Sequence, residues 1–179
     1  MKKLTILTAF IAVLIAGCSP KYIKDGSVIS GFSFKQTYKI AVLTPYVSGM
    51  SDMNYAYRLG DHAILRIMEA RRLVPSNKFE MRQMEQAKGI GHFKQPSPFE
   101  ATGIARQLGA DLVMITEIGT QPVAGDKLAP LYCSVSIIEV STGNQIYPGN
   151  GRTANPVSKE AAGEWLIDLA TDVFIKGFK

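Results

Sequence analysis

Few side chains in this sequence could serve as nucleophiles or as acid–base catalysts. The 179 residues include two cysteines and two histidines. His62 and His92 lack the spacing, to each other or to a cysteine, that metal ligands need. Alternation along an expected strand places Cys133 on the apolar face, where a thiol is usually an inert small hydrophobe. The sequence therefore predicts no enzyme and no catalytic, metal or cofactor site, although a thiol-dependent enzyme using Cys133 stays open as a third hypothesis.

Two further patterns that could bind ligands are weak. Gly89-Ile90-Gly91 resembles a glycine-rich phosphate loop, but the third glycine is missing and no strand leads directly into a helix there. Met50 and Met53, with Met81 and Met84, could offer soft metal ligands. Methionine more commonly fills gaps in a core or an interface. We therefore expect a flexible loop and packing methionines at these positions.

The net charge suggests, at first sight, a nucleic-acid partner. The chain carries 20 lysines and arginines against 15 acidic residues, which gives a formal charge of +5. The basic residues are scattered, and no basic run is interleaved with aromatic residues. We therefore expect a solvated surface and no nucleic-acid binding.

The amino terminus has the pattern of an export signal. A short basic start, Met1–Lys3, precedes thirteen residues without charge, 4–16. A helix of that length spans about 20 Å, which is too short for the ~30 Å core of a bilayer and fits a signal peptide. The segment Ile15–Cys18 resembles the bacterial lipobox, which implies cleavage after Gly17 and attachment of acyl chains such as palmitate to Cys18. Cleavage would remove two lysines and lower the net charge to +3.

Acyl chains on one cysteine should anchor the mature protein to a membrane almost permanently, because each buried methylene contributes ~0.8 kcal/mol. Ser19 follows the cysteine, and in lipoproteins of this kind a serine there favours the outer membrane. An uncleaved signal anchor is the alternative. Within the tether that follows, Val28–Ile29 and Phe32–Phe34 could add an edge strand or pack on the domain. The expected organisation is a lipoprotein signal peptide at 1–17, a lipidated tether at 18–37 and a periplasmic domain at 38–179.

Hydrophobic periodicity predicts an α/β (α+β) fold, with a mixed β-sheet of about five strands packed with three main helices. Early crossovers favour parallel pairing, and a turn at Ser141–Asn144 makes the late hairpin antiparallel. A loop containing glycine and proline should separate the third and fourth strands. The expected strands are 39–43, 78–82, 111–118, 131–140 and 145–147. The expected helices are 54–72, 97–108 and 158–176, with a short one at 83–88.

The same periodicity predicts which side chains face the core. Phe79 and Met81 should share one face of a strand. Ser97 and Glu100 form a capping box at a helix start, and the helix that follows should bury Phe99. Further inward positions are expected on the three main helices at Ala56, Leu59, Ala63, Ile64, Ile67, Met68, Ile104, Ala105, Leu108, Ala162, Trp165, Leu166, Leu169 and Val173.

Four segments of the expected domain follow one another in an order that a known family shares. They are 39–43 (KIAVL), 79–86, 105–119 (ARQLGADLVMITEIG) and 135–146 (VSIIEVSTGNQI). Behind a lipobox, this order resembles the envelope lipoproteins that include the curli-secretion lipoprotein CsgG and the penicillin-binding-protein activator LpoB. The resemblance implies a domain like the amino-terminal domain of TolB. It also implies a periplasmic protein that assembles or activates envelope machinery and catalyses nothing itself.

These features predict an outer-membrane-anchored periplasmic lipoprotein that acts as a non-enzymatic adaptor, assembly or activator subunit of a cell-envelope complex. Its expected partners are the membrane, through lipidated Cys18, and an envelope protein that the sequence does not name, with a homo-oligomer as a further option. The alternative is a periplasmic module that binds a small ligand or a glycan. Such a module would use a cleft near the strand ends and the Gly89–Pro98 loop.

Overall fold

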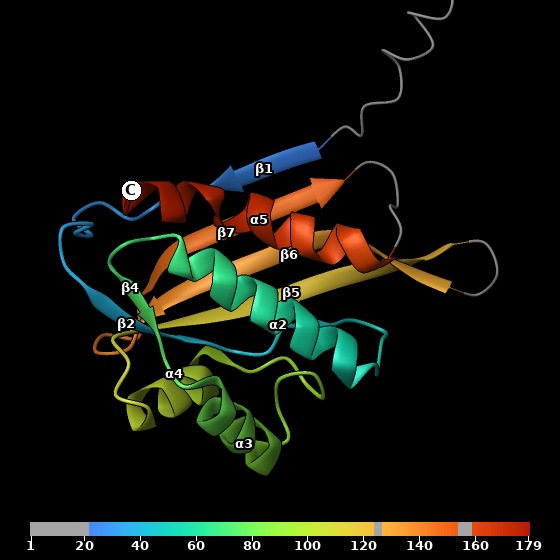
Figure 1. Cartoon of the computed structure of the whole chain (residues 1–179), viewed down its shortest axis with the longest axis horizontal. Helices are drawn as coiled ribbons and strands as arrows, with labels where there is room; N and C mark the ends of the chain where they lie inside the picture. Colours follow the sequence, from blue (N-terminus) through green and yellow to red (C-terminus); the bar gives the residue numbers. More distant parts are fainter. Residues whose placement is uncertain (1–21, 124–126, 154–158) are drawn as a thin grey trace, which may run out of the picture.

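The computed structural model describes residues 22–123, 127–153 and 159–179, which form three layers (Figure 1). A mixed seven-stranded sheet is the middle layer, and helices cover both of its faces. The class and the mixed sheet are as expected, with four helices and seven strands among the described residues. In chain order the elements are β1 (Tyr22–Gly26), β2 (Tyr38–Val42), β3 (Tyr46–Val47), α2 (Met53–Met68), β4 (Leu73–Pro75), α3 (Lys78–Lys88), α4 (Pro98–Gln107), β5 (Leu112–Val123), β6 (Lys127–Glu139), β7 (Gln145–Thr153) and α5 (Lys159–Gly177).

The sheet has a parallel half and an antiparallel half. Its strand order is β1-β7-β6-β5-β2-β4, and β3 pairs with β5 beside this path. β2 runs parallel to both of its neighbours, β4 and β5. The pairs β5–β6, β6–β7 and β7–β1 are antiparallel. The parallel pairs follow from crossovers that contain helices, whereas consecutive strands joined by tight turns must run antiparallel.

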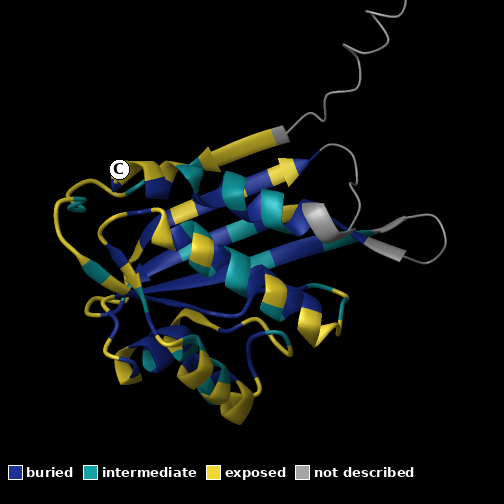
Figure 2. Ribbon diagram, viewed as in Figure 1, coloured by how far each residue is buried: buried dark blue, intermediate teal, exposed yellow. Residues whose placement is uncertain are grey.

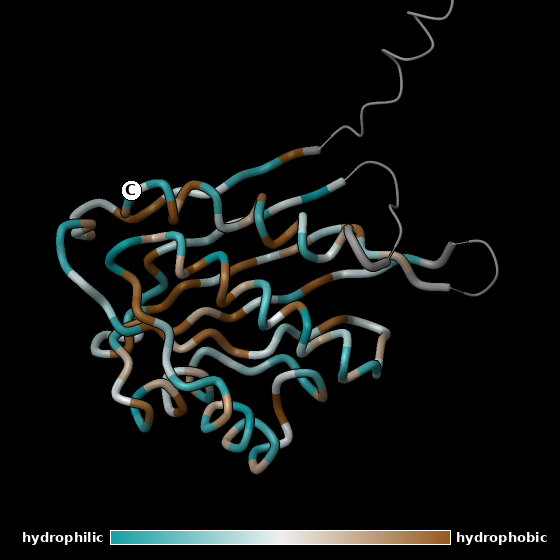
Figure 3. The backbone as a smooth tube through the Cα atoms, viewed as in Figure 1, coloured by the Kyte–Doolittle hydropathy of each residue, from teal (hydrophilic) through white to brown (hydrophobic). Residues whose placement is uncertain are grey.

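Helices bury both faces of the sheet, so the central strands are apolar on both sides. Along β2, Ile40 and Val42 face the core covered by α2 and α5. Ala41 and Leu43 face the second core, which α3 and α4 cover. This burial explains the continuous apolar runs of the central strands. Figure 2 shows these strands as buried, and Figure 3 shows the hydrophobic residues concentrated along them.

The folded domain extends upstream of Tyr38, where the sequence analysis placed its start. β1 pairs with β7 along its whole length. Phe32 and Phe34 pack against Phe174 and Phe178, with ring centroids 5.0 to 6.2 Å apart. From residue 22 onward, the expected tether is therefore part of the domain. The expected signal peptide, the lipidation site and the first residues of the tether lie outside the described residues.

The expected strand at 78–82 is wrong, because these residues form the first turns of α3. The Asn77 side chain caps this helix by accepting a hydrogen bond from the backbone N–H of Phe79, and Gly89 ends it with a left-handed φ of 63°. Helical spacing separates the two side chains that were expected to share a strand face. Met81 is buried, whereas Phe79 is 68% exposed.

The start of α4 is as expected, but its first aromatic residue points outward. Ser97 accepts a hydrogen bond from the backbone N–H of Glu100, and the Glu100 carboxylate accepts from the backbone N–H of Ser97. Hydrogen bonds from the backbone N–H and the hydroxyl of Ser97 lower the pKa of the Glu100 carboxyl to about 2. The face that this helix buries is that of Ala101, Ile104 and Ala105. Phe99 lies on the other side, 86% exposed, so its expected burial is wrong.

The two longest helices lie close to their expected positions, but some of the residues expected to face the core are exposed. α2 is capped by Asp52 and ends at Met68, four residues before the expected end. Met68 is 60% exposed and Val173 of α5 is 39% exposed, so neither belongs to the core as expected. Phe174 and Ile175 take the inward place on α5.

β5 and β6 continue through the segment that was expected to be a loop. β5 runs to Val123 and β6 begins at Lys127, with a shift in register between Gly119 and Thr120. A Cβ atom at Gly119 would lie 1.9 Å from the ring of Tyr132, so the ring in its observed position packs over a glycine. Gly119 and Pro130 lie at this irregular pairing, where glycine and proline are tolerated in strands.

β7 is also longer than expected, and two of its glycines allow α5 to pack closely against it. A Cβ atom at Gly149 would lie 2.1 Å from the carbonyl oxygen of Ala170, and one at Gly151 would lie 2.8 Å from that of Leu166. α5 therefore lies directly on the β7 backbone. Such close approach of a helix to a strand is a reason for glycine inside a strand.

Candidate functional site

The described surface has a shallow pocket where β3 ends, beside the loop between α3 and α4. Its volume is about 370 Å³. The expected ligand cleft near the strand ends and the Gly89–Pro98 loop coincides with this place. The pocket is lined by Tyr46, Val47, Gly49, Met50, Ser51, His92 and Phe93.

His92 belongs to an aromatic group at the side of this pocket. Its ring centroid lies 3.7 Å from that of Phe93 and 5.7 Å from that of Tyr57. The guanidinium of Arg82 lies 4.3 Å from the centre of the Tyr57 ring, and the Tyr57 hydroxyl accepts a hydrogen bond from Gln86. Partial burial lowers the pKa of His92. The imidazole is therefore neutral at pH 7, which suits stacking better than anion binding.

Glu85, which the sequence analysis did not single out, is a buried carboxylate beneath the same loop. It is 3% exposed. Its two oxygens accept hydrogen bonds from the backbone N–H and the hydroxyl of Thr44, at 2.7 and 2.6 Å. Burial raises its pKa, and the bonds from Thr44 oppose that effect. The pair fastens α3 to the residues that follow β2, and a threonine directly after a buried strand is the only local hint of it.

Gly89 lies at the end of α3, and Gly91 packs against the Glu85 carboxylate. Gly89 ends the helix, and Gly91 has a φ of 79°. A Cβ atom at Gly91 would lie 3.3 Å from the Glu85 carboxylate carbon, while Ile90 is buried in the core under α3 and α4. A helix end and close packing thus account for the glycines that resembled a phosphate loop.

Cys133 lies in the core, as expected from alternation. It is fully buried on β6. Burial raises the pKa of its thiol, and the nearby charge of Glu117 acts in the same direction. A catalytic thiolate needs the opposite environment, cationic and partly exposed. The thiol is therefore not accessible to a substrate in this conformation.

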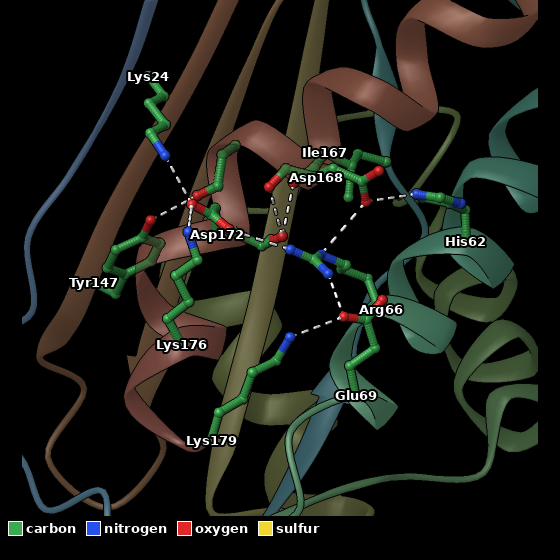
Figure 4. A network of polar contacts seen from close by, with 12 residues as sticks. Lys24, His62, Arg66, Glu69, Tyr147, Ile167, Asp168, Asp172, Lys176 and Lys179 are labelled. Carbon is green, nitrogen blue, oxygen red and sulfur yellow. Dashed lines mark hydrogen bonds and ion pairs between the residues drawn. The ribbon is translucent and has the colours of Figure 1, made fainter.

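His62 connects α2 to α5 through carboxylates (Figure 4). Its Nε2 lies 2.9 Å from Asp168, and its Nδ1 lies 4.0 Å from Glu164. The hydrogen bond with Asp168 raises the pKa of His62, and partial burial opposes this. Arg66, one turn further along α2, lies 3.5 Å from Asp168 and 3.4 Å from Asp172. The histidine thus has the partners of a structural ion-pair network.

The same network reaches the amino-terminal strand and the carboxyl terminus. Lys24 of β1 and Lys176 of α5 each lie 2.8 Å from Asp172. Hydrogen bonds from Lys176 and then Lys24 lower the pKa of Asp172. Lys179 lies 3.4 Å from Glu69 at the end of α2. Figure 4 shows Lys24 and Lys176 reaching Asp172, and Lys179 reaching Glu69. The network holds β1, α2 and α5 together.

The methionines occupy packing positions. Met81 is buried under α3 and α4, and Met84 packs beside it. Met50 packs against the other core, and Met53 is 40% exposed. Among the described residues, no group of three or more histidines, cysteines or acidic residues is placed to hold a metal ion. None of the helices in the described part of the chain is both long and apolar enough to cross a membrane.

A second shallow pocket, of about 340 Å³, lies at the opposite end of the sheet, where β2 begins and β6 ends. Lys39 and Asp111 connect the neighbouring strand starts, because the Asp111 carboxylate accepts from the backbone N–H of Lys39 at 2.8 Å. Unlike the lining of the first pocket, this lining includes an arginine and two acidic residues. It consists of Tyr38, Arg106, Ala110, Asp111, Glu139, Val140 and Ser141.

Comparisons with known proteins identify the fold. No protein-family model matches the chain, and no curated protein matches it. The structure is similar to PelC from Paraburkholderia phytofirmans, a dodecamer, with a TM-score of 0.53 and 12% identity over 88% of this chain and 98% of that chain. It is similar to Escherichia coli LpoB, with a TM-score of 0.52 and 19% identity over 66% of this chain and 57% of that chain. A DUF4136 family protein from Bacteroides thetaiotaomicron has a TM-score of 0.50 and 10% identity over 87% of this chain and 95% of that chain. At these identities the likeness concerns the fold alone, and it confirms the expected LpoB-like architecture.

Proposed function

We propose that this protein is a periplasmic lipoprotein, anchored in the outer membrane by acyl chains on Cys18, that acts as a non-enzymatic adaptor, assembly or activator subunit of an envelope complex. The observation that carries the proposal is the lipobox at Ile15–Cys18 in front of a domain with the LpoB fold. We place the protein among the CsgG- and LpoB-like lipoproteins, with residues 1–17 as signal peptide. The structure leaves only a short chain between Cys18 and the domain.

Metabolic labelling tests the anchor. The full chain, expressed in a Gram-negative host with an alkyne analogue of palmitate, should carry the label and separate with the outer membrane. Cys18→Ala should abolish labelling and release the protein from the outer-membrane fraction, while Cys133→Ala, at the other cysteine, should leave labelling unchanged. Label retained by the Cys18→Ala protein would contradict the proposal.

The adaptor role is tested by what the anchored protein binds. Crosslinking in cells, detergent extraction and affinity capture should recover one envelope protein in a fixed ratio, a homo-oligomer, or both. PelC, with the same fold, is a dodecamer, so the mass of the extracted complex should be measured as well. A protein that stays monomeric and without a partner at its native abundance would contradict this role.

A binding module for a small ligand or a glycan is the second candidate, because the pocket at Tyr46 and Phe93 lies where the sequence analysis expected a ligand cleft. Aromatic side chains there could stack on the apolar face of a sugar. A glycan that binds should raise the melting temperature of the native protein. Phe93→Ala should remove that rise, whereas Phe79→Ala, which truncates a similarly exposed phenylalanine outside the pocket, should preserve it. A panel of periplasmic glycans that leaves the melting temperature unchanged would count against this candidate.

A further inference from the structure

β1 begins at one corner of the sheet, and we infer that this corner lies against the headgroups of the membrane that holds the lipid anchor. The corner consists of Tyr22 and Ile23 of β1 with their partners Thr153 and Arg152 of β7, and we call it the anchor corner. The inference rests on the proposed anchoring at Cys18. It adds an orientation: one corner of the domain faces lipid, and the diagonally opposite corner faces the periplasm.

Only a short stretch of chain separates the proposed anchor from the domain. Residues 19–21 separate Cys18 from Tyr22, where β1 begins. A fully extended chain spans at most ~3.6 Å per residue, so Tyr22 lies within about 14 Å of the anchored cysteine. A tether that continued to residue 37 would have reached about 70 Å by the same measure. The short connection places the anchor corner next to the headgroups.

β1 is fixed to the rest of the domain. All five of its residues pair with β7, from Tyr22 opposite Thr153 to Gly26 opposite Gly149. Lys24 of β1 lies 2.8 Å from Asp172 of α5. After the strand, the chain returns to the sheet, where the backbone N–H of Ile29 donates to the carbonyl of Ile146 at 3.0 Å. The anchor therefore constrains the whole domain rather than a loose strand.

The surface at this corner suits a lipid boundary. Ile23 is 67% exposed on the outermost strand of the sheet, where soluble proteins usually place charged residues or proline to protect the edge. Arg152, beside it on β7, is exposed and basic. An apolar side chain next to a cation matches the boundary between acyl chains and anionic headgroups.

The hairpin of β5 and β6 projects from the same end of the sheet, as Figure 1 shows. Ile23 is level with Tyr132 of β6 and Gly119 of β5 across the paired strands. β5 continues from Gly119 to Val123, which adds about 13 Å at the usual rise of a strand. The hairpin thus reaches about as far beyond the sheet as the connection to Cys18 does, so both can meet one membrane surface.

Val74 marks the opposite corner. It lies on β4, the other edge strand, and is 52% exposed. Five strand spacings and about eight residues of strand rise separate it from Ile23, which amounts to about 35 Å across the sheet. With the short connection added, the domain reaches about 50 Å from the membrane surface. The envelope partner must therefore present its binding surface within that distance of the outer membrane.

Photocrosslinking to lipid tests the orientation. Ile23 and, in a second protein, Val74 are replaced by benzoylphenylalanine, a matched pair because both side chains are exposed on edge strands. Each mature chain is coupled through the Cys18 thiol to a maleimide lipid in vesicles of phosphatidylethanolamine and phosphatidylglycerol. Cys133 is buried and does not compete for the maleimide. A melting curve establishes that each variant is folded before irradiation.

Given the ~35 Å between the two positions, we expect on the order of tenfold more lipid adduct, by mass spectrometry, at position 23 than at position 74. Equal yields, or a higher yield at position 74, would overturn the orientation. Because the maleimide supplies the anchor, this result does not depend on acylation in cells. An unmodified Cys18 in cells would instead refute the proposed anchoring, so the two failures are distinguishable.

Discussion

The two faces of the sheet are built in different ways. The core under α2 and α5 contains aromatic side chains from both ends of the described chain, Phe32 and Phe34 with Phe174 and Phe178. The core under α3 and α4 is aliphatic, and its helices, with β5, follow one another in the sequence. The first face therefore depends on contacts between distant segments, and the second depends mainly on local order. Among the described residues, Glu85 is the buried carboxylate beneath the second face.

The largest effect should come from the centre of the aromatic face. Phe174 is fully buried and contacts Phe32, Phe34, Tyr147 and Phe178. We expect Phe174→Ala to lower the free energy of unfolding by about 3–5 kcal/mol, against about 2–4 kcal/mol for Ile104→Ala on the other face. Chemical denaturation of both variants measures the difference. A larger loss for Ile104→Ala would reverse the comparison.

The amino-terminal segment should contribute less than Phe174 does. Phe34 is partly buried against Phe174 and Phe178, so Phe34→Ala should cost about 1.5–3 kcal/mol. Ile29, 44% exposed in the same segment, supplies the control, because Ile29→Ala should cost about 0.5 kcal/mol or less. Equal small losses in denaturation would mean that residues 22–37 add little to the aromatic face.

Substitutions at Glu85 test what the buried carboxylate contributes to the other face. Glu85→Ala should lower the free energy of unfolding by about 2–3 kcal/mol, because the buried N–H of Thr44 loses its acceptor. Glu85→Gln retains an acceptor for that N–H and a donor for the hydroxyl, and should cost much less.

The pH dependence of these variants distinguishes charge from hydrogen bonding. Burial raises the pKa of Glu85 above its ordinary 4.5, so the folded state binds its proton more tightly than the unfolded chain does. The resulting stability is present below pH 4.5 and is lost as the pH rises through the folded pKa. The native protein should show this loss relative to Glu85→Gln in denaturation series between pH 4 and 7. If the free energy of unfolding changed with pH in the same way in both proteins, the raised pKa of Glu85 would be contradicted.

A smaller effect is expected from His62 on the aromatic face. The pKa of His62 is raised above 6.5 by Asp168, so its contribution is full below pH 6.5 and is lost as the pH rises through the folded pKa. The side chain is 26% exposed, and we expect less than about 1 kcal/mol in all. Proton NMR titration of the imidazole measures the shift, and His62→Gln should remove the matching slope in stability. A pKa at or below 6.5 would contradict the expectation.

The smallest effect should come from Phe99. The side chain is 86% exposed, so Phe99→Ser should change the free energy of unfolding by no more than about 0.5 kcal/mol. Ser97→Ala, two residues earlier, removes the helix cap and should cost about 1 kcal/mol. Denaturation curves compare the two. A loss above that of Ser97→Ala would show that the aromatic ring is buried after all.

Elements that depend on neighbouring residues could be predicted. The strand at 39–43, the capping box of Ser97 and Glu100, and the burial of Cys133 all follow from short patterns, and the structure confirms them. The α3 helix was missed because a short alternating run fits a strand as well as a helix, and the cap at Asn77 decided the outcome. The location of a pocket beside the Gly89–Pro98 loop could be expected, but Glu85 behind it could not.

The sequence by itself determined the class of the domain, most of its helix positions and the antiparallel pairing of its late hairpin, because periodicity, caps and turn residues act within a few residues. The lipidation of Cys18 remains a prediction from the lipobox. Only the tertiary structure decided that residues 22–37 belong to the domain, since β1 and the phenylalanines find their partners more than a hundred residues away. It also decided the length of β7, because Gly149 and Gly151 lie within the strand, at the positions where α5 packs directly on its backbone. Contacts between distant segments leave no periodic trace in the chain, and here they set how few residues separate the folded domain from Cys18.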